Sequence, residues 1–277
     1  MSLEFLPVLY IKASSNYDVG NIIGRTFKGS IKEYLNFSDD VKMYRKFFND
    51  QRGKAIVEQY LKTSEKYQPD IVSEIRGIAD GSGESFMDVF MLQIASEIQF
   101  YHYEDLFPNN DAPKNQVTKG CTDILLNTAA GRAIGHNDDW SEDVAARVAI
   151  VHVTLTKDGF EKESFLSYLY PGYLPGFCFG MNKNLVVTLN SLKPARANPG
   201  GVPLLLRTLL GNSSISDCRE RMASLPVGCA FGMNVNIAEI GTDKMCSLEI
   251  YTHLNLLHVY RVNPHRHQPC VSLPFLN

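Results

Sequence analysis

The spacing of hydrophobic residues changes near residue 120. Upstream, apolar residues recur at helical intervals, whereas downstream of Cys121 they fall in short strand-like runs separated by turn residues. Helices followed by hairpin strands are typical of the α+β class, in which helices cover the layers of a sheet. The pattern therefore predicts an α+β fold with a helical segment at 1–120 and a strand-rich segment at 121–277.

Apolar spacing and capping residues predict the helices of the first segment. Ser15-Asn16-Tyr17-Asp18 offers capping side chains, and Ser85 with Asp88 does so again after the break at Asp80-Gly81-Ser82-Gly83. Gly20 and Gly24 are four residues apart on one predicted helix, which indicates that another element approaches that face closely. The predicted elements are a strand at 7–12 and helices at 19–35, 41–66, 70–79 and 86–98.

A hairpin is predicted directly after Cys121. Residues 123–127 and 132–138 flank a tight turn at Ala129-Ala130-Gly131, so the two runs should pair and return Asp139 to the start of the first strand. Further strands are predicted at 144–156, 160–170, 177–181, 185–192, 230–238, 245–251 and 256–262, with helices at 203–210 and 216–225. Residues 264–270 lack any periodicity.

Overall composition excludes several functional classes. A formal charge of -3 over 277 residues provides no basic stripe for phosphates, which disfavours nucleic-acid binding. The sequence has no secretory signal at its start and no apolar window approaching the ~20 residues of a membrane span. We therefore expect a cytoplasmic protein that binds neither nucleic acid nor membrane.

Cys121 stands where self-cleavage is chemically plausible. The six cysteines include no C-x-x-C pair, and for each of them a reduced, buried structural role is the simplest interpretation. However, the glycine before Cys121 leaves the carbonyl unshielded, so the sulfur could attack it and give an ester that water opens. The freed α-amine, with an ordinary pKa of about 8, could then act as base for the thiol, whose ordinary pKa is about 8.5. The Pro-, Asn- and Asp-rich stretch 106–119 is typical of an exposed loop, which a processing site requires.

These residues match a known family. Gly120-Cys121-Thr122, the Gly131-Arg132 turn and Gly135-His136-Asn137-Asp138-Asp139-Trp140 resemble the N-terminal-nucleophile (Ntn) cysteine hydrolases of the acyl-coenzyme A:6-aminopenicillanate acyltransferase family. The resemblance spans roughly residues 8–250, and its most specific part is the spacing from Cys121 to Asp139. Leu9-Tyr10-Ile11-Lys12 and Leu174-Pro175-Gly176 resemble the β-alanyl-amine hydrolases of the family most closely.

The resemblance implies a four-layer αββα sandwich made from a precursor that cuts itself between Gly120 and Cys121. Cys121 would be the nucleophile of both self-cleavage and turnover, and Asp139 the carboxylate beside the new N-terminus. The implied reaction is hydrolysis of a β-alanyl amide of dopamine or histamine through a thioester, without a metal or organic cofactor. The partners implied are a small-molecule amide and the other processed fragment, assembled as a homodimer or a heterotetramer.

The sequence departs from the family near its end. The family adds a His-x-Asn motif, whose asparagine helps hold the oxyanion, and later an arginine and further strands. His253-Leu254-Asn255 has that form but follows Glu249 too closely, so we interpret it as strand or turn, and the sandwich is expected to be incomplete at the C-terminus. Two alternatives to hydrolysis stay open, namely acyl transfer from coenzyme A to an amine, and an inactive chain that acts only as a binding partner.

Other candidate residues have simpler interpretations. Asp138 is the alternative to Asp139, because neighbours on a strand face opposite ways and only one can face the thiol; we favour Asp139 for its spacing. His136 fits a structural histidine better than a base. Asn182 and Asn190 could line a pocket or support turns. His265, His267 and Cys270 lack a fourth ligand for zinc, so no metal site is predicted.

Overall fold

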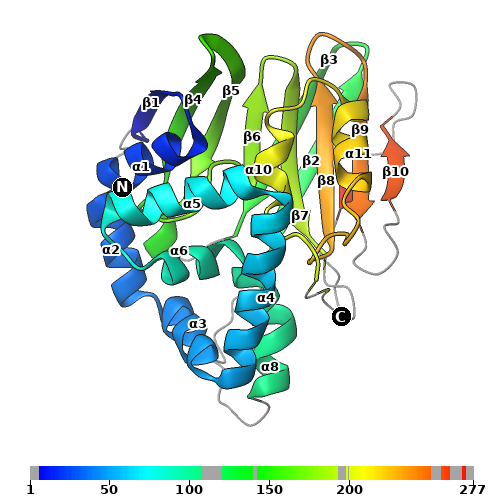
Figure 1. Ribbon diagram of the computed structural model, residues 1–277. Helices are drawn as coiled ribbons and strands as arrows, with labels where there is room; N and C mark the ends of the chain where they lie inside the picture. The colour runs from blue at the N-terminus through cyan, green and yellow to red at the C-terminus, as the bar shows by residue number, and fades with distance from the viewer. Residues whose placement is uncertain are drawn as a thin grey trace.

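The computed structural model describes residues 6–107, 120–139, 142–192, 198, 200–250, 257–262 and 270–272, and they form two sheets with helices (Figure 1). The larger sheet has the order β1-β4-β5-β6-β7-β8-β9-β10 and the smaller one β11-β2-β3. All neighbours pair antiparallel except β1 and β4, which are parallel. The strands of the large sheet are β1 (Val8–Ala13), β4 (Ala149–Lys157), β5 (Phe160–Leu169), β6 (Phe179–Asn182), β7 (Leu185–Ser191), β8 (Met233–Glu239), β9 (Met245–Ile250) and β10 (Leu257–Arg261).

The small sheet and the helices complete the described structure. The small sheet contains β2 (Cys121–Thr128), β3 (Gly131–Asp138) and β11 (Cys270–Ser272). The helices are α1 (Asn16–Thr26), α2 (Lys28–Phe37), α3 (Asp39–Asn49), α4 (Gln51–Tyr67), α5 (Pro69–Ser82), α6 (Phe86–Gln93), α7 (Ala95–Glu97), the π-helical turn η1 (Ile98–His102), α8 (Tyr103–Leu106), α9 (Glu142–Ala145), α10 (Leu205–Leu209) and α11 (Ile215–Ala223). Among the described residues, no helix combines the length and apolarity needed to cross a bilayer.

Alternation along β7 and β8 explains how the layers are stacked. Val187 and Ile237 point to the side where Leu209 and Met222 of α10 and α11 pack, and these side chains form one buried cluster. The residues between them, such as Thr188 and Asn236, point to the other side, where β2 lies. In Figure 1, α10 and α11 accordingly lie in front of β7, β8 and β9, while β2 and β3 lie behind. The α+β class is confirmed, and the complete four-layer αββα order stays a prediction.

The predicted elements are largely present, with several corrected boundaries. The hairpin forms as expected, with Asn127 opposite Arg132 and Cys121 opposite Asp138. The predicted helix 19–35 is two helices that meet at Phe27, and 41–66 is likewise interrupted at Asp50, whose side chain caps α4 by accepting from the backbone N–H of Arg52 and Gly53.

Three further predictions are corrected, and two others lie outside the described residues. The break expected at 80–83 comes late, because α5 continues to Ser82 and ends at Gly83 with φ 74°. Residues 142–145 are helical rather than the start of a strand. Cys270, the last residue of the stretch expected to be irregular, begins β11 (Cys270–Ser272), which pairs with β2. Residues 108–119 of the predicted loop, together with 264–269, lie outside the described residues.

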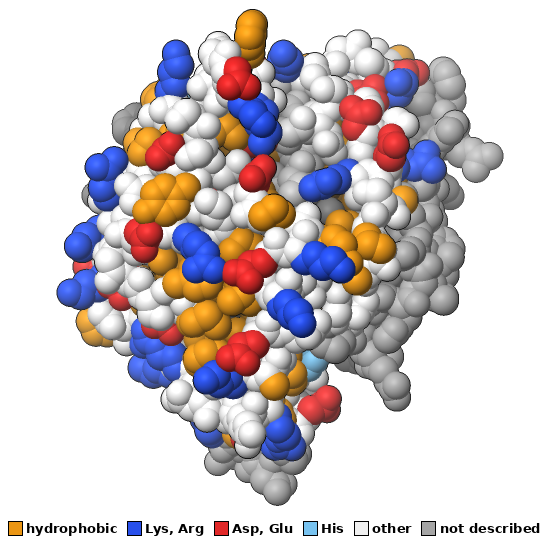
Figure 2. Space-filling view, in the orientation of Figure 1, with side chains coloured by type: hydrophobic (Ala, Val, Ile, Leu, Met, Phe, Trp, Pro, Cys, Tyr) orange, Lys and Arg blue, Asp and Glu red, His pale blue; other side chains and the backbone are white. Residues whose placement is uncertain are grey.

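The surface of the described residues carries charge of both signs. On the face seen in Figure 2, Lys and Arg side chains are interspersed with Asp and Glu over the helices, and hydrophobic side chains gather between them. Basic side chains do not form a stripe on that face among the described residues. This distribution agrees with the small formal charge of -3.

Four glycines let α1 and α5 pack with their backbones in contact. A Cβ built on Gly20 would lie 1.9 Å from the carbonyl oxygen of Glu74, and one on Gly24 would lie 2.3 Å from that of Ile78. The glycines Gly77 and Gly81 of α5 meet the backbone of α1 in the same way. The close approach expected from Gly20 and Gly24 is therefore confirmed, and its partner is α5.

Substituting Gly20 should destabilise the protein even though alanine is the better helix former. A Cβ at this position can only be accommodated if backbone moves, so we expect Gly20→Ala to lower the free energy of unfolding by at least about 2 kcal/mol, measured by urea denaturation. Gly29→Ala on α2 is the matched control, because a Cβ there meets nothing within 4 Å. It should stabilise by about 0.5–1 kcal/mol, and equal effects of the two changes would contradict the packing described.

A buried carboxylate connects the two sheets. Asp123 on β2 has no exposed surface and accepts hydrogen bonds from Thr188 Oγ1 at 2.6 Å and Asn190 Nδ2 at 3.1 Å on β7, and from Asn236 Nδ2 on β8. His136 Nδ1 lies 2.6 Å from its other oxygen. Burial alone would raise the pKa of Asp123, but hydrogen bonds from His136, Thr188 and Asn236 outweigh burial and lower the pKa below its ordinary value.

Asp123→Asn should therefore lower the free energy of unfolding by an amount that depends on pH. An acid whose pKa is lower in the folded state stabilises the protein above its unfolded pKa of about 3.9, and this contribution disappears as the pH falls through the folded pKa. We expect a loss of about 2 kcal/mol at pH 7 that shrinks below about pH 4, measured by urea unfolding at several pH values. Asp158→Asn, in a turn at φ 52° that asparagine also tolerates, should change little at any pH. A pH-independent cost at Asp123 would contradict this account.

Candidate active site

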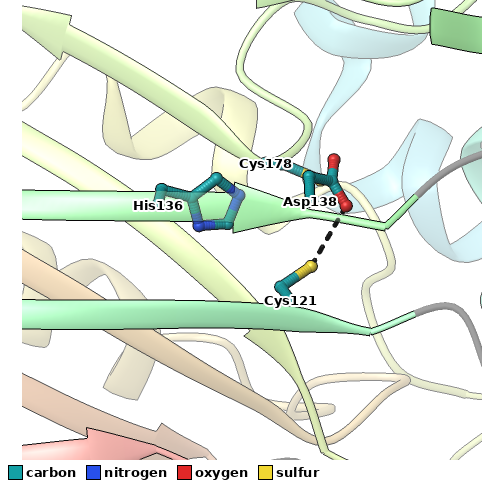
Figure 3. A group of neighbouring side chains, drawn as sticks. All are labelled: Cys121, His136, Asp138 and Cys178. Atoms are coloured by element: carbon teal, nitrogen blue, oxygen red, sulfur yellow. Dashed lines mark hydrogen bonds between the residues drawn. The ribbon is translucent and has the colours of Figure 1, made fainter.

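The end of the β2–β3 hairpin places a thiol against a carboxylate. Cys121 is the first residue of β2 and pairs with Asp138, the last residue of β3, so their side chains lie on the same face of the small sheet. The Cys121 thiol donates to Asp138 Oδ1 at 3.2 Å (Figure 3). Tyr170, just after β5, donates its hydroxyl to Asp138 Oδ2. The carboxylate of Asp138 is thus held between the thiol and a phenol.

This geometry corrects the choice between the two neighbouring acids. Asp138 faces the thiol, so the expectation that Asp139 rather than Asp138 does so is wrong. The Asp139 side chain accepts a hydrogen bond from Asn137 Nδ2 at 2.8 Å and is exposed. The pairing register, rather than the spacing to Cys121, determines which acid faces the thiol, and it places Asp138 opposite Cys121. A catalytic role for Asp139 stays a prediction.

Asp139 nevertheless contacts the peptide bond at which cleavage is predicted. Its backbone N–H donates to the carbonyl oxygen of Gly120 at 2.8 Å. This oxygen belongs to the Gly120–Cys121 peptide bond and would carry negative charge if the sulfur of Cys121 attacked. A backbone N–H aimed at a carbonyl oxygen in this way is the usual element of an oxyanion hole. The contact does not depend on the side chain at position 139.

Two protonated groups surround the pair of Cys121 and Asp138. Cys178, which precedes β6, is buried, and its hydrogen bond with Cys121, together with burial and the charge of Asp138, raises its pKa well above the ordinary value. Burial, followed by the nearby Cys178 and Asp138, also raises the pKa of Tyr170. Both groups therefore keep their protons at neutral pH and are suited to donate hydrogen bonds. No sequence motif indicated either residue, because both are far from Cys121 in the sequence and are brought to it only by the packing of the strands.

His136 completes a group of four neighbouring side chains. Cys121, His136, Asp138 and Cys178 each offer a ligand atom, and these atoms lie within 4.8 Å of one another (Figure 3). Two sulfurs, an imidazole and a carboxylate are ligands that zinc accepts. However, Asp138 is engaged by Cys121 and Tyr170, while His136 contacts Asp123 through Nδ1 and leaves only its Nε2 without a hydrogen-bond partner. We therefore interpret the group as the surroundings of a nucleophile.

The thiol opens into a cavity. The cavity encloses about 1030 Å³ of empty space, including the part that is open to solvent. Gly120, Cys121, Asp138 and Asp139 line it on the hairpin side. The rest is lined by the helical segment, with Glu97 and Phe100, and by the chain after β5 and between β7 and β8, with Cys178, Arg207 of α10 and Phe231. A thiol, a carboxylate and an oriented backbone N–H at the wall of one cavity can perform acyl chemistry on a bound amide.

Arg207 of α10 lines the cavity, but its positive charge is already paired with carboxylates. Its guanidinium pairs with Glu74 of α5 and with Glu163 of β5, both at 3.0 Å. Asn16 of α1 donates to the same Glu74 at 2.7 Å. The two carboxylates outweigh burial and raise the pKa of Arg207, so it stays charged. This buried network joins the helices to the large sheet and was not foreseen from the sequence.

The remaining candidates lie away from the thiol or outside the described residues. Asn182 donates to the carbonyl oxygens of Leu210 and Asn212, and its own Oδ1 accepts from the β6–β7 turn, so it is a turn residue. Asn190 is one of the residues that bind Asp123. The motif His253-Leu254-Asn255 and the histidines at 265 and 267 lie outside the described residues.

Comparison with known proteins finds similarity over part of the site: the family match includes Asp138 and Asp139 and begins after Cys121. Residues 126–241 match the family profile described as acyl-coenzyme A:6-aminopenicillanic acid acyl-transferase. The chain is 27% identical over 258 residues to the β-alanyl-dopamine/carcinine hydrolase of Drosophila melanogaster, an alignment that covers 88% of this chain and 64% of that relative. The chain thus spans less than two thirds of the length of this relative. These matches confirm the resemblance seen in the sequence: the chain is similar to the acyl-coenzyme A:6-aminopenicillanic acid acyl-transferase family over residues 126–241, and to the hydrolase over most of its own length.

Proposed function

We propose that this protein is a self-processing cysteine amidohydrolase that acts on β-alanyl amides of aromatic amines. The observation that supports it most directly is the geometry of Cys121, whose thiol contacts Asp138 at 3.2 Å while the preceding carbonyl oxygen accepts from the Asp139 backbone at 2.8 Å. Nucleophile, proton acceptor and oxyanion donor thus meet at one peptide bond. The relationship to an enzymatic family and to a hydrolase supports an enzyme.

Self-cleavage would proceed by transfer of the acyl group to sulfur. The Cys121 thiol gives its proton to Asp138, the sulfur bonds to the carbonyl carbon of Gly120, and the C–N bond breaks as the nitrogen of Cys121 takes up a proton. Water then hydrolyses the thioester, leaving a carboxylate on Gly120 and a free amine on Cys121. The Asp139 N–H stabilises the oxyanion in both steps. We propose that the side chain of Asp139 then turns to hold the freed ammonium.

Turnover would repeat this chemistry on a bound amide. The sulfur of Cys121 attacks the amide carbonyl, the amine leaves with a proton, and water releases the acyl group from the thioester. The rings of Phe100 and Phe231, with centroids 6.3 Å apart, both line the cavity and are suited to pack against the ring of an aromatic amine. The relative's substrates, by its name, are β-alanyl-dopamine and carcinine, which have such rings.

Acyl transfer is the second candidate, because the matching family is described as an acyltransferase. The two reactions share the acyl-enzyme and differ in the acceptor that reaches it. Adding a free amine during turnover distinguishes them, since a transferase forms a new amide at the expense of hydrolysis. A chain that only binds a partner would show neither product and no cut at Cys121.

Cys121→Ala should abolish self-cleavage. Without the sulfur the acyl shift has no nucleophile, so purified Cys121→Ala should remain one intact chain, whereas the unaltered protein should yield two fragments by intact mass measurement. Cys218→Ala is the matched control, because Cys218 is a buried residue of α11 that does not line the cavity. Cleavage that persists in Cys121→Ala, or an unaltered protein that stays whole, would contradict the proposal.

The two neighbouring acids should affect different steps. Asp138→Asn removes the proton acceptor of the thiol and should slow self-cleavage by about 10²-fold or more, measured as the rate of fragment appearance. Asp139→Asn keeps the backbone N–H, so cleavage should stay within about tenfold while turnover by the cleaved enzyme falls further. Slow cleavage in Asp139→Asn with normal cleavage in Asp138→Asn would reverse the assignment.

A further inference from the structure

The cavity contains an acid that the proposed reaction does not use. Glu97, the last residue of α7, is 4% exposed and lines the same cavity as Cys121. In the described part of the chain, its carboxyl is reached by its own backbone N–H and by no cationic side chain. Buried carboxylates are normally paired with a cation or fully hydrogen-bonded, so an unpaired one at a cavity wall indicates a ligand.

The other charged groups of the cavity are already engaged. Arg207 is held by two carboxylates, Glu74 and Glu163. Asp138 is bound by Cys121 and Tyr170, and Asp139 is exposed to water. Among the described residues that line the cavity, Glu97 is therefore the buried acid whose negative charge is not paired with a cation. A cationic ligand would meet an unpaired acid there without competing with a protein cation.

The groups around Glu97 are uncharged. Tyr44 of α3, Tyr60 of α4, Tyr101 of η1 and Cys229 lie within its electrostatic range, and their pKa values are raised, mainly by burial, so they keep their protons. His102 contacts the Tyr60 hydroxyl, and burial lowers its pKa, which favours the neutral ring. Burial also raises the pKa of Glu97 to about 8. A bound cation would offset the cost of burying the negative charge and would thereby favour the ionised form of Glu97.

We propose that Glu97 determines substrate specificity by binding the protonated amine of the β-alanyl group. This inference rests on the proposed hydrolysis at Cys121 and adds the group that reads the acyl part of the substrate. A β-alanyl amide carries a primary amine that is an ammonium at neutral pH, whereas the corresponding propionyl amide has the same shape without the charge. A buried carboxylate distinguishes the two by ion pairing.

Two substrates and two variants test the inference. The substrates are N-β-alanyldopamine and N-propionyldopamine, and the variants are Glu97→Gln, which keeps the shape of the side chain, and Glu58→Gln, which removes an exposed charge on α4. We expect Glu97→Gln to lose at least about 30-fold in kcat/KM for the β-alanyl amide, mainly through KM, and less than about threefold for the propionyl amide. Glu58→Gln should change neither.

The outcomes separate this inference from the proposed function. Equal losses on both substrates would mean that Glu97 supports the fold, and an unchanged preference for the β-alanyl amide would mean that another group binds the ammonium; either result overturns the inference. In either of these cases the proposed function still holds if the unaltered protein hydrolyses both amides and Cys121→Ala abolishes that hydrolysis. Failure of the unaltered protein to hydrolyse either amide overturns the proposed function and the inference with it.

Discussion

The site depends on the buried carboxylate of Asp123. Its contacts with β7 and β8 fix the β2–β3 hairpin against the large sheet, and the strand register then determines what lies at the end of the hairpin. Two residues before Asp123, Cys121 faces Asp138 at the wall of the cavity. Because the donors to Asp123 come from both sheets, the position of the thiol is coupled to the packing of the layers.

The distribution of charge in the cavity limits the chemistry it supports. Arg207 is neutralised by Glu74 and Glu163, and the thiol is surrounded by groups that keep their protons, namely Cys178 and Tyr170. The Cys121 thiol donates its hydrogen bond to Asp138, which makes this carboxylate the proton acceptor in the proposed self-cleavage. This arrangement supports a first cut that uses a side-chain carboxylate and later turnovers that use the new amine as base.

Local sequence patterns predicted the hairpin and most strands because both depend on alternation and turn residues that lie close in the chain. They predicted the Gly20 and Gly24 contact for a similar reason, since glycine on a helix face indicates close approach. They did not resolve Asp138 from Asp139, because that choice depends on which residue of β3 pairs with Cys121. Glu97, Cys178 and Arg207 gave no signal, because each joins the cavity only through packing between distant segments.

Helix boundaries failed for a different reason. The apolar spacing of 19–35 continues through Phe27, yet the backbone leaves the helical conformation there, so that α1 ends at Thr26 and α2 begins at Lys28. Similarly, Asp50 interrupts 41–66 because its carboxylate satisfies the first backbone N–H groups of α4. The spacing of apolar residues alone does not reveal such an interruption.

The central claim is that Cys121 carries the acyl group. It is tested most directly by acid-quenching the protein during turnover of N-β-alanyldopamine and locating the modified residue by peptide mass spectrometry. The account predicts one β-alanyl group on a peptide that begins at Cys121 and its loss on treatment with hydroxylamine, which cleaves thioesters. A peptide that runs uncut through Gly120 and Cys121, or an acyl group on any other residue, would contradict it.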